Sequence, residues 1–336
     1  MEKMKQKYTV VIHGPFEGNA YDDIYMSLCD VNGNISNVVI STYIDSKNDV
    51  KPIETMFASK FNTYTVFSED IINPGYFNLN RQILLVRAAL NYVDDDSIII
   101  KIRNDQWCKM KPLLKILDKL YSSDTEERFL TTNCFTRMDR YYHPSDMFLC
   151  GRKKFFEEYY SFPYQMSTHD DIQLQMIEKL RSIKTDFTKI LVSPESELFK
   201  NYLINKKWNL KYTFDDSFQA LKKYVYMINT WDISLRWNKQ RNAFLPAKTI
   251  ILPYKFDIEP FADAPVEKAR CYCRSDFNGY KTLKDIIFIF FSKLVFSIKY
   301  NRIHNLLLKL ENKIPVSLVI KIKKSKYRDF IRNVMR

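Results

Sequence analysis

Three apolar runs in the sequence end in residues that could bind or transform a polar ligand. These residues are His13, Gly14 and Pro15 after the first run, Ser41 and Thr42 after the second, and Arg103, Asn104 and Asp105 after the run at 97–102. In open α/β sheets, ligands bind outside the carboxyl ends of the strands. If the runs are parallel strands of one sheet, the sequence predicts a shared binding site at that edge. The alternative for residues 14–15 is an ordinary Gly-Pro turn.

Asp105 is the residue of this set with the most specific chemistry. A carboxylate at a strand end, opposite a diphosphate, can bind Mg²⁺ or Mn²⁺ while phosphate oxygens and water complete the coordination shell. The metal ion would then stabilise negative charge on a departing nucleoside diphosphate. Arg103 could contribute bidentate contacts to the same phosphates. The alternative is an ion pair within a loop, which contributes little to stability.

Strand-like and helix-like segments alternate along the first 150 residues. We expect strands at 8–12, 37–42, 63–67, 97–102 and 128–134, and helices at 79–92 and 111–121. Several of the strand runs are apolar throughout, which is typical of parallel strands that helices cover on both faces. The sequence therefore predicts an α/β fold with a mostly parallel sheet. Beyond residue 150 the pattern is more helical, with helices expected at 170–181 and 195–205.

The composition of this 336-residue chain excludes several classes of protein. Hydrophobic residues make up 46% and charged residues 27%, which excludes a fully disordered chain. The net charge is +13, but residues 281–336 alone carry 14 basic and three acidic residues, which leaves a net charge of +2 for the first 280 residues. A nearly neutral body does not fit a protein that binds nucleic acid over its surface. No apolar run reaches the roughly 18 residues that a membrane-spanning helix needs.

Residues 281–336 form a basic tail. Between 286 and 298, Phe, Ile and Leu residues at helical spacing stand beside Lys284, Lys293 and Lys299, and more basic residues follow at 321–332. This pattern is typical of a helix that lies on an anionic lipid surface. We therefore expect residues 1–280 to form the folded domain and residues 281–336 to associate with a membrane. The alternative is that 286–298 is a core helix and only the last residues form a basic end.

Six short blocks, taken together, are similar to a known family. They are VVIHGPF at 10–16, ISTYIDS at 40–46, NLNRQI at 78–83, IIKIRND at 99–105, HPSDMFLCG at 143–151 and SPESELFKNYL at 193–203. Their order resembles that of the WavE-type lipopolysaccharide biosynthesis proteins over roughly residues 8–205. The chain departs from the family pattern at His13 for Gln, at Tyr43 for Trp, and at Ser196 and Glu197 for Gln-Tyr. These changes concern donor or acceptor identity more than the class of protein.

The resemblance implies a glycosyltransferase with a GT-A-like nucleotide-binding sheet. A donor half would cover about residues 1–110 and an acceptor half about residues 111–280. The enzyme would move a sugar from a nucleotide-sugar donor to a lipid-linked saccharide during bacterial lipopolysaccharide or capsule synthesis. It would use Mn²⁺ or Mg²⁺, bound by Asp105, although the sequence lacks a clean DxD motif. It would act in the cytoplasm, on the inner face of the inner membrane.

The same resemblance assigns residues to the donor. The predicted donor-binding residues are His13, Gly14, Pro15, Thr42, Asn80, Arg81, Gln82 and Arg103. Asn80, Arg81 and Gln82 would open a helix whose first N–H groups favour phosphate. A basic side chain at a helix N-terminus is locally unfavourable, so Arg81 indicates a ligand there. Its alternative is a solvated residue of the first turn.

The acceptor and the catalytic base are expected later in the chain. The predicted acceptor-binding residues are His143, Ser145, Asp146 and Gly151, with a capped turn before a strand as the alternative. An inverting transfer needs a general base to deprotonate the acceptor hydroxyl. Glu195 is the first choice and Asp170 or Asp171 the second. All three also fit an ordinary helix cap, and in a retaining enzyme they would only orient the substrate.

Two other functions compete with this prediction. A metal-dependent glycosyl-phosphate or nucleotidyl transferase would also use Asp105 but would release a different phosphate product. A nucleic-acid-binding protein would depend on the basic tail, and the nearly neutral body argues against it. We therefore expect no nucleic acid among the partners.

Overall fold

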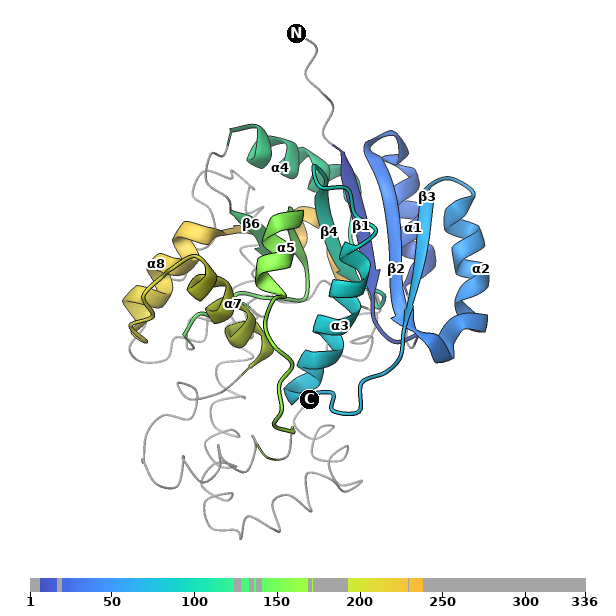
Figure 1. The fold of residues 1–336 in the computed structure, drawn as a ribbon. Helices are drawn as coiled ribbons and strands as arrows, with labels where there is room; N and C mark the ends of the chain where they lie inside the picture. Colours follow the sequence, from blue (N-terminus) through green and yellow to red (C-terminus); the bar gives the residue numbers. More distant parts are fainter. Residues whose placement is uncertain are drawn as a thin grey trace, which may run out of the picture.

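The computed structural model describes residues 7–16, 20–123, 128–132, 136, 141–168, 171, 193–228 and 230–237, and the structural statements below concern these residues. Figure 1 shows their helices and strands. The basic tail at 281–336 and most of the helix expected at 170–181 lie outside the described residues. Both therefore stay predictions.

Seven of the described strands form one sheet in the order β3-β2-β1-β4-β7-β6-β8 (Figure 1). The pairs β3–β2, β2–β1, β1–β4 and β6–β8 are parallel, whereas β7 runs antiparallel to both β4 and β6. The expected α/β fold with a mostly parallel sheet is confirmed. The strand bounds are β1 Tyr8–His13, β2 Ile35–Tyr43, β3 Asn62–Ser68, β4 Ile98–Arg103, β6 Phe129–Thr132, β7 Leu149–Arg152 and β8 Val225–Ile228.

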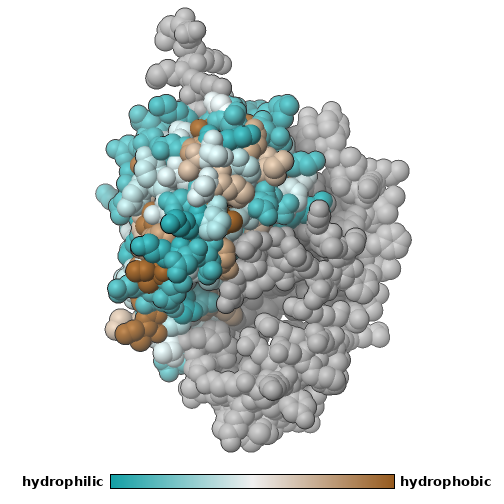
Figure 2. All heavy atoms as spheres, turned by 90° about the vertical axis from the view of Figure 1, so that its right-hand side faces the viewer, coloured by the Kyte–Doolittle hydropathy of each residue, from teal (hydrophilic) through white to brown (hydrophobic). Residues whose placement is uncertain are grey.

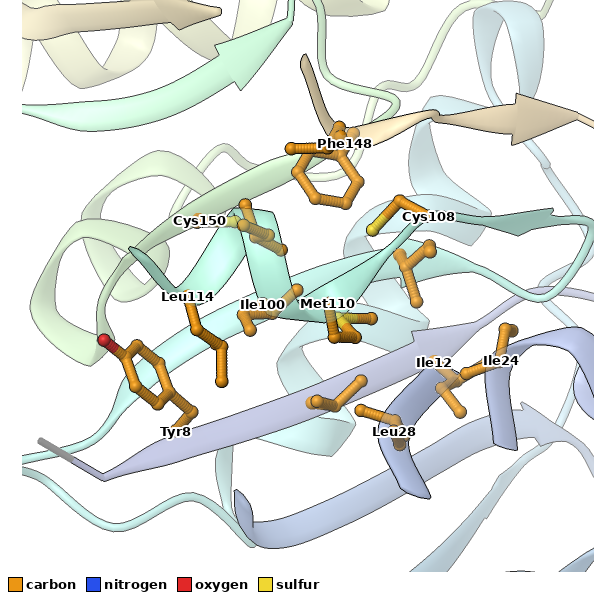
Figure 3. Packing of buried hydrophobic residues seen from close by; sticks show 14 of the residues in the cluster. Tyr8, Ile12, Ile24, Leu28, Ile100, Cys108, Met110, Leu114, Phe148 and Cys150 are labelled. Atoms are coloured by element: carbon orange, nitrogen blue, oxygen red, sulfur yellow. The ribbon is translucent and has the colours of Figure 1, made fainter. Parts of the chain in front are cut away.

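Helices cover both faces of this sheet. Successive side chains of a strand point to opposite faces, so a strand that is apolar throughout presents apolar side chains on both faces, and both must be buried. On one face, α1, α2 and α4 pack on residues such as Ile12 and Ile100, and Figure 3 shows part of that core. On the other face, α3, α5, α7 and α8 pack on residues such as Val11 and Ile99. The helix bounds are α1 Tyr21–Cys29, α2 Lys47–Ala58, α3 Leu79–Leu90, α4 Met110–Ser123, α5 Lys153–Tyr159, α7 Pro194–Asn205 and α8 Phe214–Tyr224.

A small second sheet lies beyond the end of β4. It consists of β5 (Gln106–Trp107) and β9 (Arg236–Trp237), which pair antiparallel. Trp107 pairs with Arg236, so the two residues that follow Asp105 in the chain are paired with residues more than a hundred positions away. The end of β4 is therefore held by tertiary structure as well as by its own sheet.

The coloured part of the surface in Figure 2, which belongs to described residues, is largely hydrophilic with smaller hydrophobic areas. Exposed apolar side chains of the described residues include Ile72, Phe77 and Met166. None of the described helices combines the length and the hydropathy that crossing a bilayer requires.

Candidate active site

The ends of β1, β2 and β4 meet at one edge of the sheet, as the sequence predicts. His13 lies in register with both Ser41 and Arg103. The Gly14 N–H donates to the Ser41 carbonyl at 3.2 Å, and the Thr42 hydroxyl donates to the Gly14 carbonyl at 2.9 Å. The structure thus brings the three strand-end groups together. Thr42 is buried there and holds the turn through its backbone contact.

The backbone at position 14 and the packing around it favour glycine over any residue with a side chain. Its φ of 140° is a conformation that L side chains rarely adopt, and a Cβ there would lie 2.5 Å from the Asn104 Oδ1 atom. The Asn104 side-chain amide donates to the Pro15 carbonyl, and its backbone N–H donates to the His13 carbonyl at 3.0 Å. Asn104 therefore holds the turn at 13–15 against the end of β4.

Substitution Gly14→Ala is expected to destabilise the protein by about 1–3 kcal/mol, because it adds a strained φ and displaces Asn104. Chemical denaturation measures the loss in the free energy of unfolding. Gly151→Ala is a useful comparison, since its Cβ would meet the Phe155 ring at 2.7 Å without a positive φ. Unchanged stability of Gly14→Ala would contradict the close packing of this turn.

His13 lies at the same edge as a buried neutral imidazole. Burial, followed by the nearby charges of Lys101 and Arg103, holds the pKa of His13 well below its usual value. Its Nε2 atom is buried and makes no hydrogen bond within the described part of the chain. A buried polar atom without a partner costs free energy, so this nitrogen is suited to a hydrogen bond with a bound ligand.

Lys101 is a fully buried lysine in the middle of β4 and is not among the site residues predicted from the sequence. Its backbone pairs with Val11 of β1 and Leu149 of β7. The ammonium donates to the Asp146 carbonyl and lies 5.8 Å from the centroid of the Tyr160 ring. Burial lowers the pKa of Lys101 to about 8, against the opposing attraction of Asp146.

Glu195 and His143 meet although 52 positions separate them in the chain. The Glu195 Oε2 atom lies 3.7 Å from the His143 Nε2 atom. Ser193 caps α7 by accepting from the Ser196 N–H at 3.3 Å, and the Ser196 hydroxyl donates to the Tyr141 carbonyl at 3.1 Å. The start of α7 is thereby fixed beside the segment that carries His143. The helix expected at 195–205 is confirmed, beginning one residue earlier.

Asp146, in the segment before β7, lies near Lys101 and Glu195. Because β7 is antiparallel, that segment lies at the edge where β4 ends, with Leu149 opposite Lys101. Burial and then the Asp146 charge raise the pKa values of Tyr159 and Tyr160, and Glu195 raises that of Tyr159 further. The Tyr159 hydroxyl is buried and makes no hydrogen bond to a described residue.

These side chains form one cluster, and we call it the site cluster. It lies on the face of the sheet that α3, α5 and α7 cover, at the carboxyl end of β4. Gln82 of α3 reaches it through a 3.2 Å hydrogen bond to the Tyr160 hydroxyl. The members of the site cluster are His13, Lys101, Arg103, His143, Asp146, Tyr159, Tyr160 and Glu195.

Asp105 is 2% exposed and is held by Arg103. The Arg103 Nε and Nη2 atoms donate to its two carboxylate oxygens, each at 3.0 Å. The described residues contain no group of three or more His, Cys, Asp or Glu side chains that could hold a metal ion. As arranged here, Asp105 does not fit a metal ligand, because Arg103 donates to both of its carboxylate oxygens. The predicted Mn²⁺ or Mg²⁺ requirement stays a prediction.

Asn80 and Arg81 have other partners in this structure. The Asn80 side-chain amide donates to the Gln165 carbonyl at 2.8 Å and accepts from the Gln165 N–H at 2.6 Å. Arg81 forms an ion pair with Asp70 on the surface, and its Nη1 atom donates to Asn78 at 3.1 Å. Asn80 thus joins two loops, and Arg81 lies near the ends of β2 and β3. Their roles in donor binding stay predictions.

Three further predicted residues have structural contacts. The Ser145 carbonyl accepts from Thr131 at 2.8 Å, and Gly151 packs in β7 against Phe155. Asp171 is exposed and exchanges hydrogen bonds with Thr168 at 2.7 and 3.2 Å, as in a capping box. Asp170 lies outside the described residues. Of the carboxylates predicted as the base, the structure therefore brings Glu195 to the site cluster.

Comparisons with known proteins give similarity at the level of shape. No protein-family model matches the chain, and no curated protein matches it. It is similar to the 4-diphosphocytidyl-2C-methyl-D-erythritol synthase of Anaerococcus prevotii, with a TM-score of 0.34, 11% identity and coverage of 60% of this chain and 99% of that one. It is also similar to the glycosyltransferase GlyE of Streptococcus pneumoniae, with a TM-score of 0.34, 12% identity and coverage of 62% and 46%.

A third structure is a UDP-glucose pyrophosphorylase complexed with UDP-glucose. Its TM-score is 0.29 at 10% identity, with coverage of 51% of this chain and 86% of that one. All these TM-scores lie below 0.5, so the similarity by itself assigns no activity to this chain.

Proposed function

We propose that this protein is a glycosyltransferase that moves a sugar from a nucleotide-sugar donor to a saccharide acceptor. The observation that carries the proposal is the site cluster, which gathers cations, neutral hydrogen-bonding groups and two carboxylates at the carboxyl end of β4 in a mostly parallel sheet. In such sheets this edge binds ligands. The α/β fold class supports the proposal, and so do the six blocks that resemble the WavE-type family.

The side chains divide into two roles. Arg103 supplies positive charge for a departing nucleoside diphosphate, and the His13 imidazole offers a hydrogen bond without a charge. Glu195 accepts the proton of the acceptor hydroxyl as that oxygen attacks the anomeric carbon and the bond to phosphate breaks. His143 lies 3.7 Å from the Glu195 carboxylate and keeps it next to the predicted acceptor segment.

The acceptor is proposed to be a lipid-linked saccharide of bacterial surface-polysaccharide synthesis. The support is the basic tail at 281–336, with a net charge of +11 from 14 basic and three acidic residues. Each basic group near an anionic membrane contributes about 1 kcal/mol to binding. The tail would hold the enzyme on the inner face of the membrane, where such acceptors are assembled.

Donor hydrolysis tests the proposal. The purified chain is incubated with UDP-, GDP- and CMP-sugars, with Mn²⁺ and with a chelator, and the released nucleotide is measured. We expect release of the nucleotide from one donor class, faster with an added saccharide acceptor. No hydrolysis of any donor would overturn the proposal. Release of pyrophosphate from a nucleoside triphosphate and a sugar phosphate would instead favour the nucleotidyl transferase.

Removal of residues 281–336 is expected to abolish binding to vesicles that contain anionic lipid, because most of the net charge of the chain is removed. Activity on a soluble saccharide acceptor should be retained. Vesicle sedimentation with and without anionic lipid measures the binding. Unchanged sedimentation of the shortened chain would show that the tail is not the membrane contact.

A further inference from the structure

Lys101 is a buried charge whose position in the fold needs an explanation. Its side chain is 0% exposed, and it stands in a strand with apolar neighbours on both sides in sequence. Burying an ammonium group costs several kcal/mol unless charges and hydrogen bonds compensate. A methionine or leucine would fill the same space without that cost. Lys101 is therefore expected to make the fold less stable than an apolar residue would at the same position.

The surroundings of Lys101 indicate what its charge does. The ammonium donates to the Asp146 carbonyl, which fixes the backbone between His143 and β7. It also attracts the Asp146 and Glu195 carboxylates, while Arg103 repels it. The titratable groups that face it are His13 of β1, Arg103 of β4, Asp146 before β7, Tyr159 of α5, Tyr160 after it, and Glu195 of α7.

We propose that Lys101 is a positioning residue, whose ammonium holds the segment at Asp146 in place and, with that segment, holds His143 beside Glu195. Its role in transfer rests on the proposed function, because Glu195 is the proposed base. Lys101 itself need not touch the substrate. Without the ammonium, Glu195 would lose an attractive charge and the segment at Asp146 would lose a hydrogen bond.

The proposal has a pH signature. The pKa of Lys101 is lowered from 10.5 to about 8, so the native protein loses this proton near pH 8 while the unfolded chain keeps it until about pH 10.5. Below pH 8 both states are charged. Between the two values the unfolded state binds more protons, and this residue makes stability rise with pH. Activity should fall over the same range, because the positioning charge disappears.

The first experiment measures kcat and kcat/KM from pH 6 to 10 for the wild type, Lys101→Arg and Lys101→Met. We expect the wild type to lose activity with a midpoint near pH 8 and Lys101→Arg to lack this alkaline limb, because arginine stays protonated. We expect Lys101→Met to have a kcat about 10- to 100-fold lower, on the order of the effect of misplacing a reacting group by about 1 Å. Lys153→Met is the matched control, since Lys153 pairs with the exposed Asp95 and donates to a backbone carbonyl outside the cluster.

The second experiment does not need activity. Thermal unfolding of Lys101→Met, Glu195→Gln and the double variant at pH 7 forms a double-mutant cycle. We expect the two shifts in Tm not to add, since Lys101 holds the segment at Asp146, and His143 of the same stretch lies 3.7 Å from the Glu195 carboxylate. Additive shifts, or an alkaline limb that Lys101→Arg leaves in place, would overturn the proposal. A wild type that hydrolyses no donor but shows coupled shifts would overturn the proposed function and leave the coupling between Lys101 and Glu195 supported.

Discussion

Glu195→Gln is expected to lower kcat by about 10²- to 10⁴-fold, because the amide cannot accept a proton from the acceptor hydroxyl. Glutamine has nearly the same shape, and the Glu195 side chain is 19% exposed, so the free energy of unfolding should change by less than about 1 kcal/mol. Donor binding should also change little. The measurement is initial-rate kinetics of transfer, with nucleoside diphosphate binding determined by calorimetry.

Glu197→Gln is the matched control for this substitution. Glu197 stands two residues further along α7, and its Oε1 atom pairs with Lys200 at 2.5 Å. Both substitutions remove one negative charge from the same helix turn. If Glu195→Gln and Glu197→Gln have equal kcat values, Glu195 is not the base. If the enzyme retains the configuration of the sugar, Glu195→Gln should lower kcat only modestly, since the residue would then orient the acceptor.

Arg103→Gln is expected to weaken nucleoside diphosphate binding by about 10- to 100-fold, which corresponds to the roughly 1.5–3 kcal/mol of a hydrogen bond from a charged group. The same substitution leaves the Asp105 carboxylate, 2% exposed, without its bidentate partner. We therefore expect a stability loss of about 1–3 kcal/mol, less than for a fully buried pair, because Arg103 is 32% exposed. Calorimetry and chemical denaturation measure the two effects.

The double variant Arg103→Gln/Asp105→Asn separates binding from stability. Removing both charges should restore most of the lost stability but not the affinity for the nucleoside diphosphate. Arg152→Gln is the control, because Arg152 lies opposite Ile98, at the far end of β4 from Arg103. Wild-type affinity in the double variant would contradict the donor-binding prediction for Arg103.

The strands and helices that the sequence predicts well are those with a complete local pattern. The runs that form β1, β2 and β4 are mostly apolar and buried, so their positions follow from burial on both faces. The edge strand β3 is mostly half-buried or exposed, and its β-branched and aromatic residues predict it instead. The short strands β7 and β8, with four residues each, give almost no local signal. Their existence depends on contacts with β4 and β6, which come from distant parts of the chain.

Neither α1 nor α2 was predicted from the sequence, and the reason differs between the two helices. In α1 the buried residues Tyr21, Ile24 and Leu28 have helical spacing, which could have predicted the helix. In α2 a proline lies inside the helix at position 52, and only Val50 and Phe57 are buried. Because an internal proline usually ends a helix, the tertiary structure overrides the local signal there.

The site shows the same division between local and distant information. Residues that follow a strand directly, such as His13 and Arg103, could be predicted because parallel strands end at one edge. Lys101 could have been found as a lone charge inside an apolar strand, since such a charge needs partners when it is buried. The contact between His143 and Glu195 could not have been predicted from the sequence, because it depends on the antiparallel direction of β7 and on the cap of α7.

The hydrogen bonds of Gln165 oppose a hinge motion at one point of the structure. Its backbone and side chain bond to Asn73, Tyr76 and Asn80, which ties the stretch after α5 to the loop before α3. A hinge motion that separated the predicted donor and acceptor halves at this point would break several hydrogen bonds at once, at about 1 kcal/mol each. These hydrogen bonds therefore hold the stretch after α5 and the loop before α3 together.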